Sequence, residues 1–559
     1  MLPNALLPPT RVRTLPLLMG AAVLSLAPTA VAQSLPDAGR VLDEMKQPAQ
    51  PTLHTTPLTI QQPSLTPSAQ PGGPQVVLQQ VAFAGNTLFT DAELMAVLDG
   101  EIGASHDLAG LQRLAQRITA FYRMQDYPFS LAYLPPQSLT SGALTIAVVE
   151  ARYGAIEFTG DEALRQAAAS RLAYLTPDAP IKGQPLARAV HLLGDLPGIT
   201  VDPVLMPGQA VGTGDLAIAV NEAEQYAASL GVDNHGNRYT GTWRTHGTAS
   251  INRLLTLGDT LDLSVLLTEE SLWYGSLGYS LPLTNTGLRG YTRYTHTHYQ
   301  LGEEFKDLGA TGTARIGTLG LEYPLIRSER TNLYLDLAYN HKRLEDTPAE
   351  LFATTEKSSD TLVGSLRFDH RDGLFGGGLT WADVDITAGD LSLDQTLMMA
   401  DRVTAKTAGS FSKLNLELAR IQRLNTAFTL YGRLSGQWTH DNLDSSEGMS
   451  LGGANGVRAY PEGEAFGDRG WLGQLELRYQ YKQVQPYLFY DAGVIELNAR
   501  PWASGDNQRT LAGAGVGLRA NIDNWQFNLA SAWRTEGGTP QSDTKEQHPR
   551  VWGSVQYRF

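Results

Sequence analysis

The chain has 559 residues, a formal net charge of -14 and no cysteine. The length allows several domains, the negative charge argues against nucleic acid as a partner, and the missing thiols exclude disulfides and thiolate chemistry. Frequent glycine (56) and tyrosine (22) beside 42% hydrophobic residues are typical of a β-rich protein with many turns. Beyond the N-terminus no apolar run approaches the ~18 residues that a transmembrane helix needs. Any membrane span must therefore be a closed barrel, which pairs every backbone group within the protein.

Residues 1–32 have the pattern of a secretory signal peptide. Arg11 and Arg13 precede an apolar stretch, and a small-x-small cleavage site ends at Ala32. A membrane anchor is the alternative, but the apolar stretch is short and Pro16 interrupts it.

Residues 33–47 are predicted to form one short amphipathic helix. Val41, Leu42 and Met45 share its apolar face, and charged side chains cover the other face. Residues 48–75 follow with seven prolines and no Asp, Glu, Lys or Arg, a composition that cannot form a core and predicts an extended linker. At ~3.1 Å per residue the linker reaches up to about 85 Å, so the helix could be seated far away and could leave; a disordered tail is the alternative.

Two small α+β units are predicted next, at residues 76–150 and 151–225. In the first unit, one helix face carries apolar side chains at helical spacing: Leu108, Leu111, Leu114, Ala115, Ile118 and Tyr122. The remaining elements of this unit are strands at residues 77–83, 129–133 and 144–149 and a helix at 91–98. The second unit repeats the order more loosely, with strands at 155–158, 199–205 and 216–220 and helices at 161–174 and 186–193. Each unit is long enough to be an independent domain.

Residues 226–559 alternate between apolar and polar side chains, in segments separated by Gly, Asn, Asp and Ser. About sixteen segments are predicted, an even number that suits a bacterial barrel with both ends on one side; fourteen or eighteen are the alternatives. They begin near Tyr226, Thr240, Asp259, Leu272, Gly287, Thr311, Thr331, Asp360, Gly377, Ala408, Ala427, Gly470, Val484, Gln508, Trp525 and Arg550.

Parity assigns the two faces of these segments. One strand directs apolar side chains to one side, namely Trp471, Leu475, Leu477, Tyr479 and Tyr481, and carries Gln474, Glu476 and Arg478 on the other. The last segment likewise separates Val551, Val555, Tyr557 and Phe559 from Trp552, Ser554, Gln556 and Arg558. An apolar outside, a polar inside and an aromatic strand end are typical of a lipid-facing barrel. A soluble sandwich, the alternative, would bury its apolar face against a second sheet.

Residues 440–469 form the longest connection between two alternating segments. The segment is glycine-rich, with Gly452 and Gly453, and too polar for a strand or a helix. A connection this long inside a regular β structure is uncommon and usually functional. It carries Arg458, and we expect it to fold into the barrel lumen.

The next segment but one, residues 486–494, offers that arginine a partner. Parity directs Phe489, Asp491 and Gly493 into the lumen, which leaves free space beside an inward carboxylate. A guanidinium can bind such a carboxylate through two parallel hydrogen bonds. We therefore expect Arg458 to bind Asp491; an ordinary lumen salt bridge without a role in function is the alternative.

These motifs resemble a known family. The first α+β unit begins with Val81-Ala82-Phe83-Ala84-Gly85-Asn86-Thr87 and Asp91-x-Glu93-Leu94, which resembles the start of a POTRA domain, and the second unit resembles another. The long connection contains Val457-Arg458-Ala459-Tyr460, similar to the Val-Arg-Gly-Tyr/Phe tetrad of the POTRA-barrel superfamily, and the strand contains its partner motif, Phe489-x-Asp491-x-Gly493. With the N-terminal helix and about sixteen strands, the chain resembles the two-partner secretion transporters (TpsB family) of haemolysins and filamentous haemagglutinin. Ala459 stands where the family usually has glycine, which leaves open whether the backbone is left-handed there.

The resemblance implies an all-β outer-membrane barrel, two periplasmic POTRA domains and an N-terminal helix that plugs the barrel. The POTRA domains would recognise an unfolded partner exoprotein by strand addition to a sheet edge, and the chain would translocate it to the cell surface without nucleotide hydrolysis. A conformational role in transport is implied for Arg458, Asp491, Val457, Tyr460, Phe489, Gly493, Gly452 and Gly453. Phe559 resembles the assembly signal read by the barrel assembly machinery. The family also implies a monomer surrounded by lipid and lipopolysaccharide.

Three alternative functions remain. An outer-membrane protein insertase of the same superfamily predicts more POTRA domains and no plug helix. A passive porin needs no periplasmic domains, and a barrel enzyme needs a catalytic group that the sequence does not offer. We therefore expect no enzymatic activity, no cofactor and no metal. The cargo stays open among adhesins, cytolysins, contact-dependent toxins and haem-acquisition proteins.

Two further patterns are interpreted as structural. The pair His296-x-His298 is expected to line the lumen, because two imidazoles are too few for a typical metal site. The run Gly513-Ala514-Gly515-Val516-Gly517 imitates a nucleotide-binding loop, but glycine at every second position indicates one face of a strand, and no helix follows.

Overall fold

The computed structural model describes residues 37–45, 57–60, 70–347 and 354–559. The predicted signal peptide lies outside the described residues, and so does most of the predicted linker. None of the helices in the described part of the chain is long and apolar enough to cross a membrane.

The N-terminal part contains helix α1 (Ala38–Glu44) and strand β1 (Thr59–Ile60). Helix α1 lies within the segment predicted to be helical, and the side chain of Asp37 caps it by accepting a hydrogen bond from the backbone N–H of Arg40 at 3.0 Å. Strand β1 lies within the predicted linker, where the sequence indicated extended chain but no pairing partner.

The first α+β domain comprises β2 (Val76–Val77), β3 (Gln80–Ala84), α2 (Asp91–Val97), β4 (Ser105–His106), α3 (Leu108–Met124), β5 (Leu131–Tyr133) and β6 (Ala143–Val149). Strand β6 pairs with β3 in parallel and with β5 in antiparallel orientation. Thr90 and Glu93 form a capping box at the start of α2. Helix α3 covers the sheet with one apolar face, as predicted, and buries Leu111, Leu114, Ala115, Ile118 and Tyr122.

Two details of this domain differ from the prediction. The single strand expected at residues 77–83 is divided into β2 and β3, because the backbone N–H groups of Leu78 and Gln79 bond to loop carbonyls outside the ladder. Leu108 was placed on the buried helix face but is 52% exposed. It is the first helical residue after the N-cap Asp107. Helical side chains point toward the preceding turn, and no helical turn precedes Leu108.

The second α+β domain comprises β7 (Arg152–Gly160), α4 (Glu162–Arg171), α5 (Gly183–Gly194), β8 (Ile199–Pro207) and β9 (Thr213–Glu222). Its sheet has the order β1-β8-β9-β7, with β1 parallel to β8 at one edge. Helices α4 and α5 bury Leu164, Leu186 and Val190 in the domain core.

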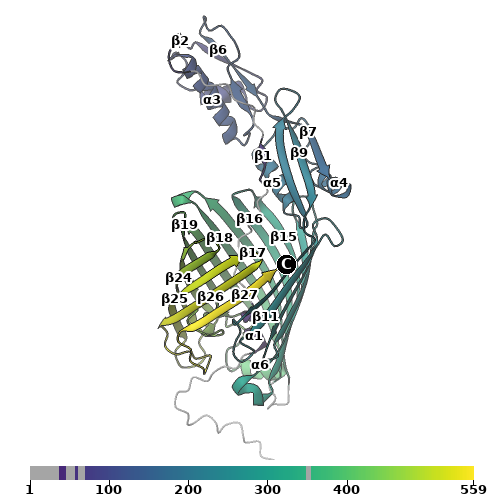
Figure 1. Cartoon of the computed structure of the whole chain (residues 1–559), viewed down its shortest axis with the longest axis vertical. Helices are drawn as coiled ribbons and strands as arrows, with labels where there is room; N and C mark the ends of the chain where they lie inside the picture. Colours follow the sequence, from purple (N-terminus) through teal and green to yellow (C-terminus); the bar gives the residue numbers. More distant parts are fainter. Residues whose placement is uncertain (1–36, 46–56, 61–69, 348–353) are drawn as a thin grey trace, which may run out of the picture. The chain divides into compact units, whose positions relative to one another are not determined.

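Within the described residues, sixteen strands form one closed barrel, which confirms the predicted fold class. They are β10 (Tyr226–Asp233), β11 (Arg244–Asn252), β12 (Thr260–Thr268), β13 (Trp273–Pro282), β14 (Arg289–Gln300), β15 (Thr311–Arg327), β16 (Thr331–Thr347), β17 (Thr355–Asp372), β18 (Gly378–Leu393), β19 (Gly409–Arg423), β20 (Phe428–Thr439), β23 (Arg469–Tyr479), β24 (Val484–Glu496), β25 (Gln508–Ile522), β26 (Trp525–Glu536) and β27 (Arg550–Arg558). Sequential strands are neighbours in the wall, where β15–β19 and β24–β27 are labelled in Figure 1. The barrel closes by antiparallel pairing of β10 with β27, from Ser229 with Arg558 to Asp233 with Ser554.

The strand starts agree with the predicted ones except in two places. Strand β11 begins at Arg244 rather than near Thr240, because Thr240 belongs to a loop in which its backbone N–H bonds to Asn237 O at 3.2 Å. Strand β17 begins at Thr355 rather than near Asp360. Its first residues are polar on both faces and pair with the end of β16, which is polar except for Leu344, so the apolar alternation starts later than the ladder.

The lipid-facing and lumen-facing sides alternate as predicted. On β23, Trp471 and Leu475 are 47% and 50% exposed, whereas Leu472 and Glu476 are each 3% exposed. On β24, Leu488 and Tyr490 are exposed, while Tyr487, Phe489 and Asp491 are buried. The exposed side chains are apolar, so this outer surface suits lipid rather than water.

The long connection between β20 and β23 folds into the barrel and packs against the inner side of its wall. Its ends pair as β21 (Met449–Ser450) and β22 (Phe466–Gly467), and it packs its apolar side chains with those of the wall in one buried cluster. Within the described residues, three short helices in other loops were not predicted, because one or two turns carry no periodic pattern. They are η1 (Glu303–Leu308), η3 (Leu374–Gly376) and α6 (Gln395–Asp401).

Candidate functional site

Arg458 of the inward loop, defined as residues 440–468, binds Asp491 on strand β24. Its Nε donates to Asp491 Oδ2 at 2.8 Å and its Nη2 donates to Oδ1 at 2.7 Å. The backbone N–H of Arg458 also donates to Oδ2, at 3.1 Å. Asp491 is fully buried. This fork fixes the direction of the loop as well as its position.

Glu476 on β23 provides a second carboxylate for the same guanidinium. Arg458 Nη1 donates to Glu476 Oε1 at 2.7 Å, while Arg478 Nε and Arg519 Nη1 donate to Oε2 at 2.8 and 2.9 Å. Parity had placed Glu476 inside the barrel but not at this site. In the β23–β24 ladder Glu476 pairs with Phe489, two residues before Asp491. This register brings Glu476 close to Asp491 and Arg458.

Two aromatic side chains complete the surroundings of Arg458. The guanidinium carbon lies 3.6 Å from the ring centroid of Phe489, a cation–π contact. The carbonyl oxygen of Arg458 accepts a hydrogen bond from Trp552 Nε1 at 2.7 Å. The sequence predicted both rings to face the lumen but assigned Trp552 no part in the site.

The electrostatics of Arg458 favour its charged form strongly. Burial lowers the pKa of its guanidinium, but the hydrogen bonds and charge of Asp491, together with Glu476, outweigh burial and raise the pKa above its ordinary value. Removing one member of a buried ion pair costs about 3–5 kcal/mol, because the partner is left uncompensated. The ion pairs of Arg458 are thus strong as long as Asp491 and Glu476 are both present, and loss of any of these three side chains would weaken them.

Glycines give the inward loop the space to approach the wall. A Cβ on Gly493 would lie 2.9 Å from the side chain of Leu451, and a Cβ on Gly452 would lie 2.3 Å from Pro461 O. Gly453 has φ +113°, a conformation that L side chains rarely adopt. The loop therefore makes close backbone contacts that larger residues at these positions would disturb.

Val457, Ala459 and Tyr460 are buried around Arg458. The backbone N–H of Val457 donates to Leu451 O at 2.7 Å, and the Tyr460 hydroxyl donates to Glu536 O at 2.6 Å. The backbone of Ala459 does not adopt a positive φ. A glycine is therefore not needed there for backbone conformation.

Glu464, a fully buried carboxylate of the inward loop, binds the connection between β26 and β27. This connection, residues 537–549, is called the outer strap here. Glu464 Oε2 accepts hydrogen bonds from the backbone N–H groups of Gln541 and Ser542 at 2.9 and 2.7 Å, and Arg509 Nη2 donates to Oε1 at 2.6 Å. No pattern in the sequence indicates this contact, because Gln541 and Ser542 contribute backbone groups.

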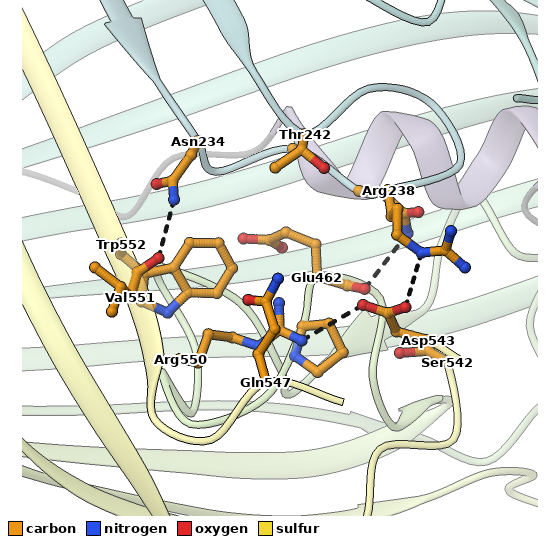
Figure 2. A pocket seen from close by; sticks show the side chains of 13 residues that line it. Asn234, Arg238, Thr242, Glu462, Ser542, Asp543, Gln547, Arg550, Val551 and Trp552 are labelled. Carbon is orange, nitrogen blue, oxygen red and sulfur yellow. Dashed lines mark hydrogen bonds and ion pairs between the residues drawn. The ribbon is translucent and has the colours of Figure 1, made fainter. Parts of the chain in front are cut away.

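Arg238, in the loop between β10 and β11, binds both the outer strap and the helix η1 between β14 and β15. Its Nε donates to Asp543 Oδ1 and its Nη1 donates to Glu303 Oε2, both at 2.9 Å. Figure 2 shows Arg238, Asp543 and Arg550 around a cavity of about 60 Å³, which Trp552 also lines. Through Trp552 this cavity adjoins the backbone of Arg458. Three loops and the inward loop thus form one connected network.

Helix α1 packs against inward-facing side chains of the barrel. Val41 is fully buried, and Leu42 and Met45 are partly buried beside it. Their cluster contains Tyr239, Leu272, Tyr299, Leu301, Ala314 and Leu344. The predicted apolar face of the helix is therefore the face that contacts the wall.

Helix α1 also contacts the inward loop directly. Ser445 Oγ donates to Asp37 Oδ2 at 2.6 Å, and Ser450 Oγ donates to Asp43 Oδ2 at 2.8 Å. A Cβ on Gly39 would lie 2.3 Å from Ser445 Oγ, so helix and loop approach closely. Neither can move far without breaking contacts with the other.

A polar cavity of about 520 Å³ remains beside helix and loop. Glu44, Glu462, Arg433 and Lys413 are among the residues that line it. In the described part of the chain, no three or more His, Cys, Asp or Glu side chains are grouped to hold a metal ion. The contacts among helix α1, the inward loop and the barrel wall can hold the loop and the helix inside the lumen, and breaking these contacts would release them.

The expectation that His296 and His298 line the lumen is wrong. On β14 the buried side chains are Thr295, Thr297 and Tyr299, so both histidines lie on the outer face. His296 stacks on the exposed ring of Trp273, with centroids 4.7 Å apart. Polar residues on both faces of this strand end made parity ambiguous.

Comparison with known proteins agrees with this architecture. Residues 212–520 match the family model described as haemolysin secretion/activation protein ShlB/FhaC/HecB, and residues 76–151 match the ShlB-type POTRA domain. The heme/hemopexin transporter protein HuxB of Haemophilus influenzae (strain 86-028NP) is 27% identical over 83% of this chain and 84% of HuxB. The outer membrane transporter CdiB of Escherichia coli O6:K15:H31 (strain 536 / UPEC) is 24% identical over 86% of this chain and 82% of CdiB.

A solved structure shows the same fold. CdiB from Escherichia coli superposes with a TM-score of 0.72 at 19% identity, covering 93% of this chain and 95% of CdiB. The family match extends over more than half of the chain and confirms the resemblance noted in its motifs. The chain belongs to the ShlB/FhaC/HecB family of haemolysin secretion/activation proteins, the outer-membrane transporters of two-partner secretion.

Proposed function

We propose that this transporter is gated by the inward loop and helix α1, which leave the lumen when an unfolded partner exoprotein passes outward. The observation that carries the proposal is the fork between Arg458 on the loop and Asp491 on the wall. It joins the inward loop to a strand whose backbone is paired on both sides, with β23 and with β25. The pair therefore sets the loop position and with it the free cross-section of the barrel.

The contacts that hold the closed state are suited to being broken and remade. Helix α1 is attached to the loop through short polar side chains, Ser445 and Ser450, which hydrogen-bond equally well to water. Arg458 and its carboxylates are polar groups that a passing polypeptide or water can also satisfy. Release of the helix would remove contacts from the loop, so the two steps support each other.

The sequence contains no motif that indicates nucleotide hydrolysis as the source of the direction of transport. We attribute it to folding of the exoprotein outside, which makes return unfavourable. In the periplasm, the two α+β domains would hold the exoprotein in an extended form through strand addition. The name of the relative HuxB makes a haem-acquisition exoprotein the first cargo to test.

Assembly and surroundings follow from the outer surface. Phe559 is 70% exposed at the end of β27, where the barrel assembly machinery could read it before the barrel closes. The apolar outer face would contact lipid and lipopolysaccharide, and the protein would act as a monomer. We expect no enzymatic activity, cofactor or metal in this cycle.

The test is single-channel conductance in planar bilayers. The mature chain is compared with a variant in which residues 33–47 are replaced by glycine and serine at equal length. A large rise in conductance supports plugging by α1. Steady, unchanged conductance would contradict the proposal and would favour an insertase or a porin.

A further inference from the structure

The edge strand of the second α+β domain is already occupied by a piece of the same chain. Strand β1 pairs in parallel with β8, Thr59 opposite Val204 and Ile60 opposite Leu205. Strand β8 extends over nine residues, and in the described part of the chain only these two positions have a partner on that edge. The edge is therefore competent for strand addition and is only partly covered.

The covering strand is held mainly through its backbone. Thr59 and Ile60 are both exposed, Ile60 by 43%. Leu58 is the side chain of this piece that packs against the domain core. Backbone pairing accepts many sequences, and so small a contact can be displaced by a longer strand. Pro203, which lacks an N–H, lies within β8, as expected of an edge strand.

We infer that the β8 edge is the docking surface for an extended segment of the exported polypeptide, and that Thr59 and Ile60 cover this edge until that segment replaces them. The inference rests on the proposed function and names the surface and the chemistry of its partner. The partner is an unfolded chain with alternating side chains, recognised through its backbone, as β1 is.

Displacement of β1 would also lengthen the tether of helix α1. Between Glu44 and Thr59 the chain can span at most about 50 Å when fully extended. A fixed point farther along the described chain is Gly72, whose backbone N–H donates to Asp107 Oδ2 at 2.7 Å. Between Glu44 and Gly72 the limit is about 95 Å, nearly double. Docking of cargo on β8 therefore gives the helix room to leave the barrel.

A disulfide tests this coupling, since the chain contains no cysteine of its own. The variant Thr59→Cys with Val204→Cys joins two residues that are opposite each other in register. The probe is a synthetic peptide of residues 55–64, added to the periplasmic side of the mature protein in a planar bilayer. Each single cysteine variant is a matched control that cannot form the bridge.

The peptide should raise the frequency of channel opening by on the order of tenfold, the size of an ordinary coupling between two sites. It should do so in the reduced variant and in both controls, and not in the oxidised variant. Oxidation should also reduce export of the partner exoprotein, and a reductant should restore it. An oxidised variant that opens with the peptide and exports normally overturns the inference, as does failure of the pair to oxidise.

A second measurement separates this inference from the proposed function. Binding of the fluorescently labelled peptide is followed by anisotropy, which requires neither export nor channel opening. Binding to the reduced and not the oxidised variant supports the β8 surface even if replacement of residues 33–47 leaves conductance unchanged. Equal binding to both overturns the surface while leaving gating by Arg458 and α1 intact.

Discussion

A Cβ placed on Gly513 of β25 would lie 2.4 Å from the Cβ of Ala459 in the inward loop. The glycines that follow on the same face serve the same purpose: a Cβ on Gly515 or Gly517 would meet the ring of Phe489 or Tyr487 at 2.3 or 2.1 Å. The glycine face is thus a flat surface on which the loop tip and the wall aromatics rest.

Gly513→Ala should displace the loop tip and increase spontaneous channel opening. Overpacking of this kind costs about 1–3 kcal/mol. Combining it with Ala459→Gly should restore much of the closed state, because the two β-carbons compete for one space. Single-channel recordings of both variants check this, and a double variant that opens as often as Gly513→Ala alone would contradict the contact.

Arg458→Lys should lower export of the partner while leaving the barrel assembled. Lysine keeps the charge but cannot form the fork with Asp491 or reach Glu476 at the same time. Export is measured in the culture medium, and assembly by heat-modifiable migration in gels. Arg420→Lys is the control, since Arg420 forms a similar pair with Asp372 between wall strands at 2.7 Å. Normal export by Arg458→Ala would count heavily against the gate.

Glu464→Gln should loosen the outer strap. The neutral amide would leave Arg509 without its buried partner and would offer one acceptor where the backbone N–H groups of Gln541 and Ser542 now share a carboxylate. We expect faster proteolysis within residues 537–549 in intact cells and more frequent channel opening. Glu546→Gln alters an exposed carboxylate of the same loop and should change neither.

Seating of helix α1 should weaken as pH rises. Burial, followed by the charge of Glu462, raises the pKa of Glu44 to about 8. Burial likewise raises the pKa of Glu462 to about 7, although the charge of Arg244 opposes this. Both carboxyls hold protons in the seated state at pH values where a released, solvated glutamate has lost them.

A raised pKa in the seated state stabilises that state at low pH, and the stabilisation is lost as pH rises toward the raised value. Channel opening should therefore increase between about pH 5 and pH 8 and level off above that range. Asp43 and Asp233, which also raise the pKa of Glu462, remain in place in the test variant Glu44→Gln with Glu462→Gln. Its opening should be nearly independent of pH, and an unchanged pH profile would contradict the assignment.

The sequence by itself determined the strands, their inward and outward faces and the identity of the pair Arg458 and Asp491. The strands and their faces are local features: alternation with period two follows from strand geometry and the lipid outside, and the positions of glycine and proline mark the turns. The two residues of the pair are 33 positions apart, and they were identified from the inward parity of Asp491 and from the resemblance of both motifs to a known family. The faces of β14 could not be assigned this way, because His296 and Thr297 are both polar.

For the other contacts between distant segments, only the tertiary structure decided which groups meet. Glu476 reaches Arg458 through strand register, Glu464 binds backbone N–H groups of the outer strap, and β1 finds the edge of β8. Backbone donors and sheet edges carry no side-chain pattern, since every residue except proline offers the same N–H and C=O. Such contacts exist only once barrel closure and domain packing have fixed which backbone groups lie within hydrogen-bond distance.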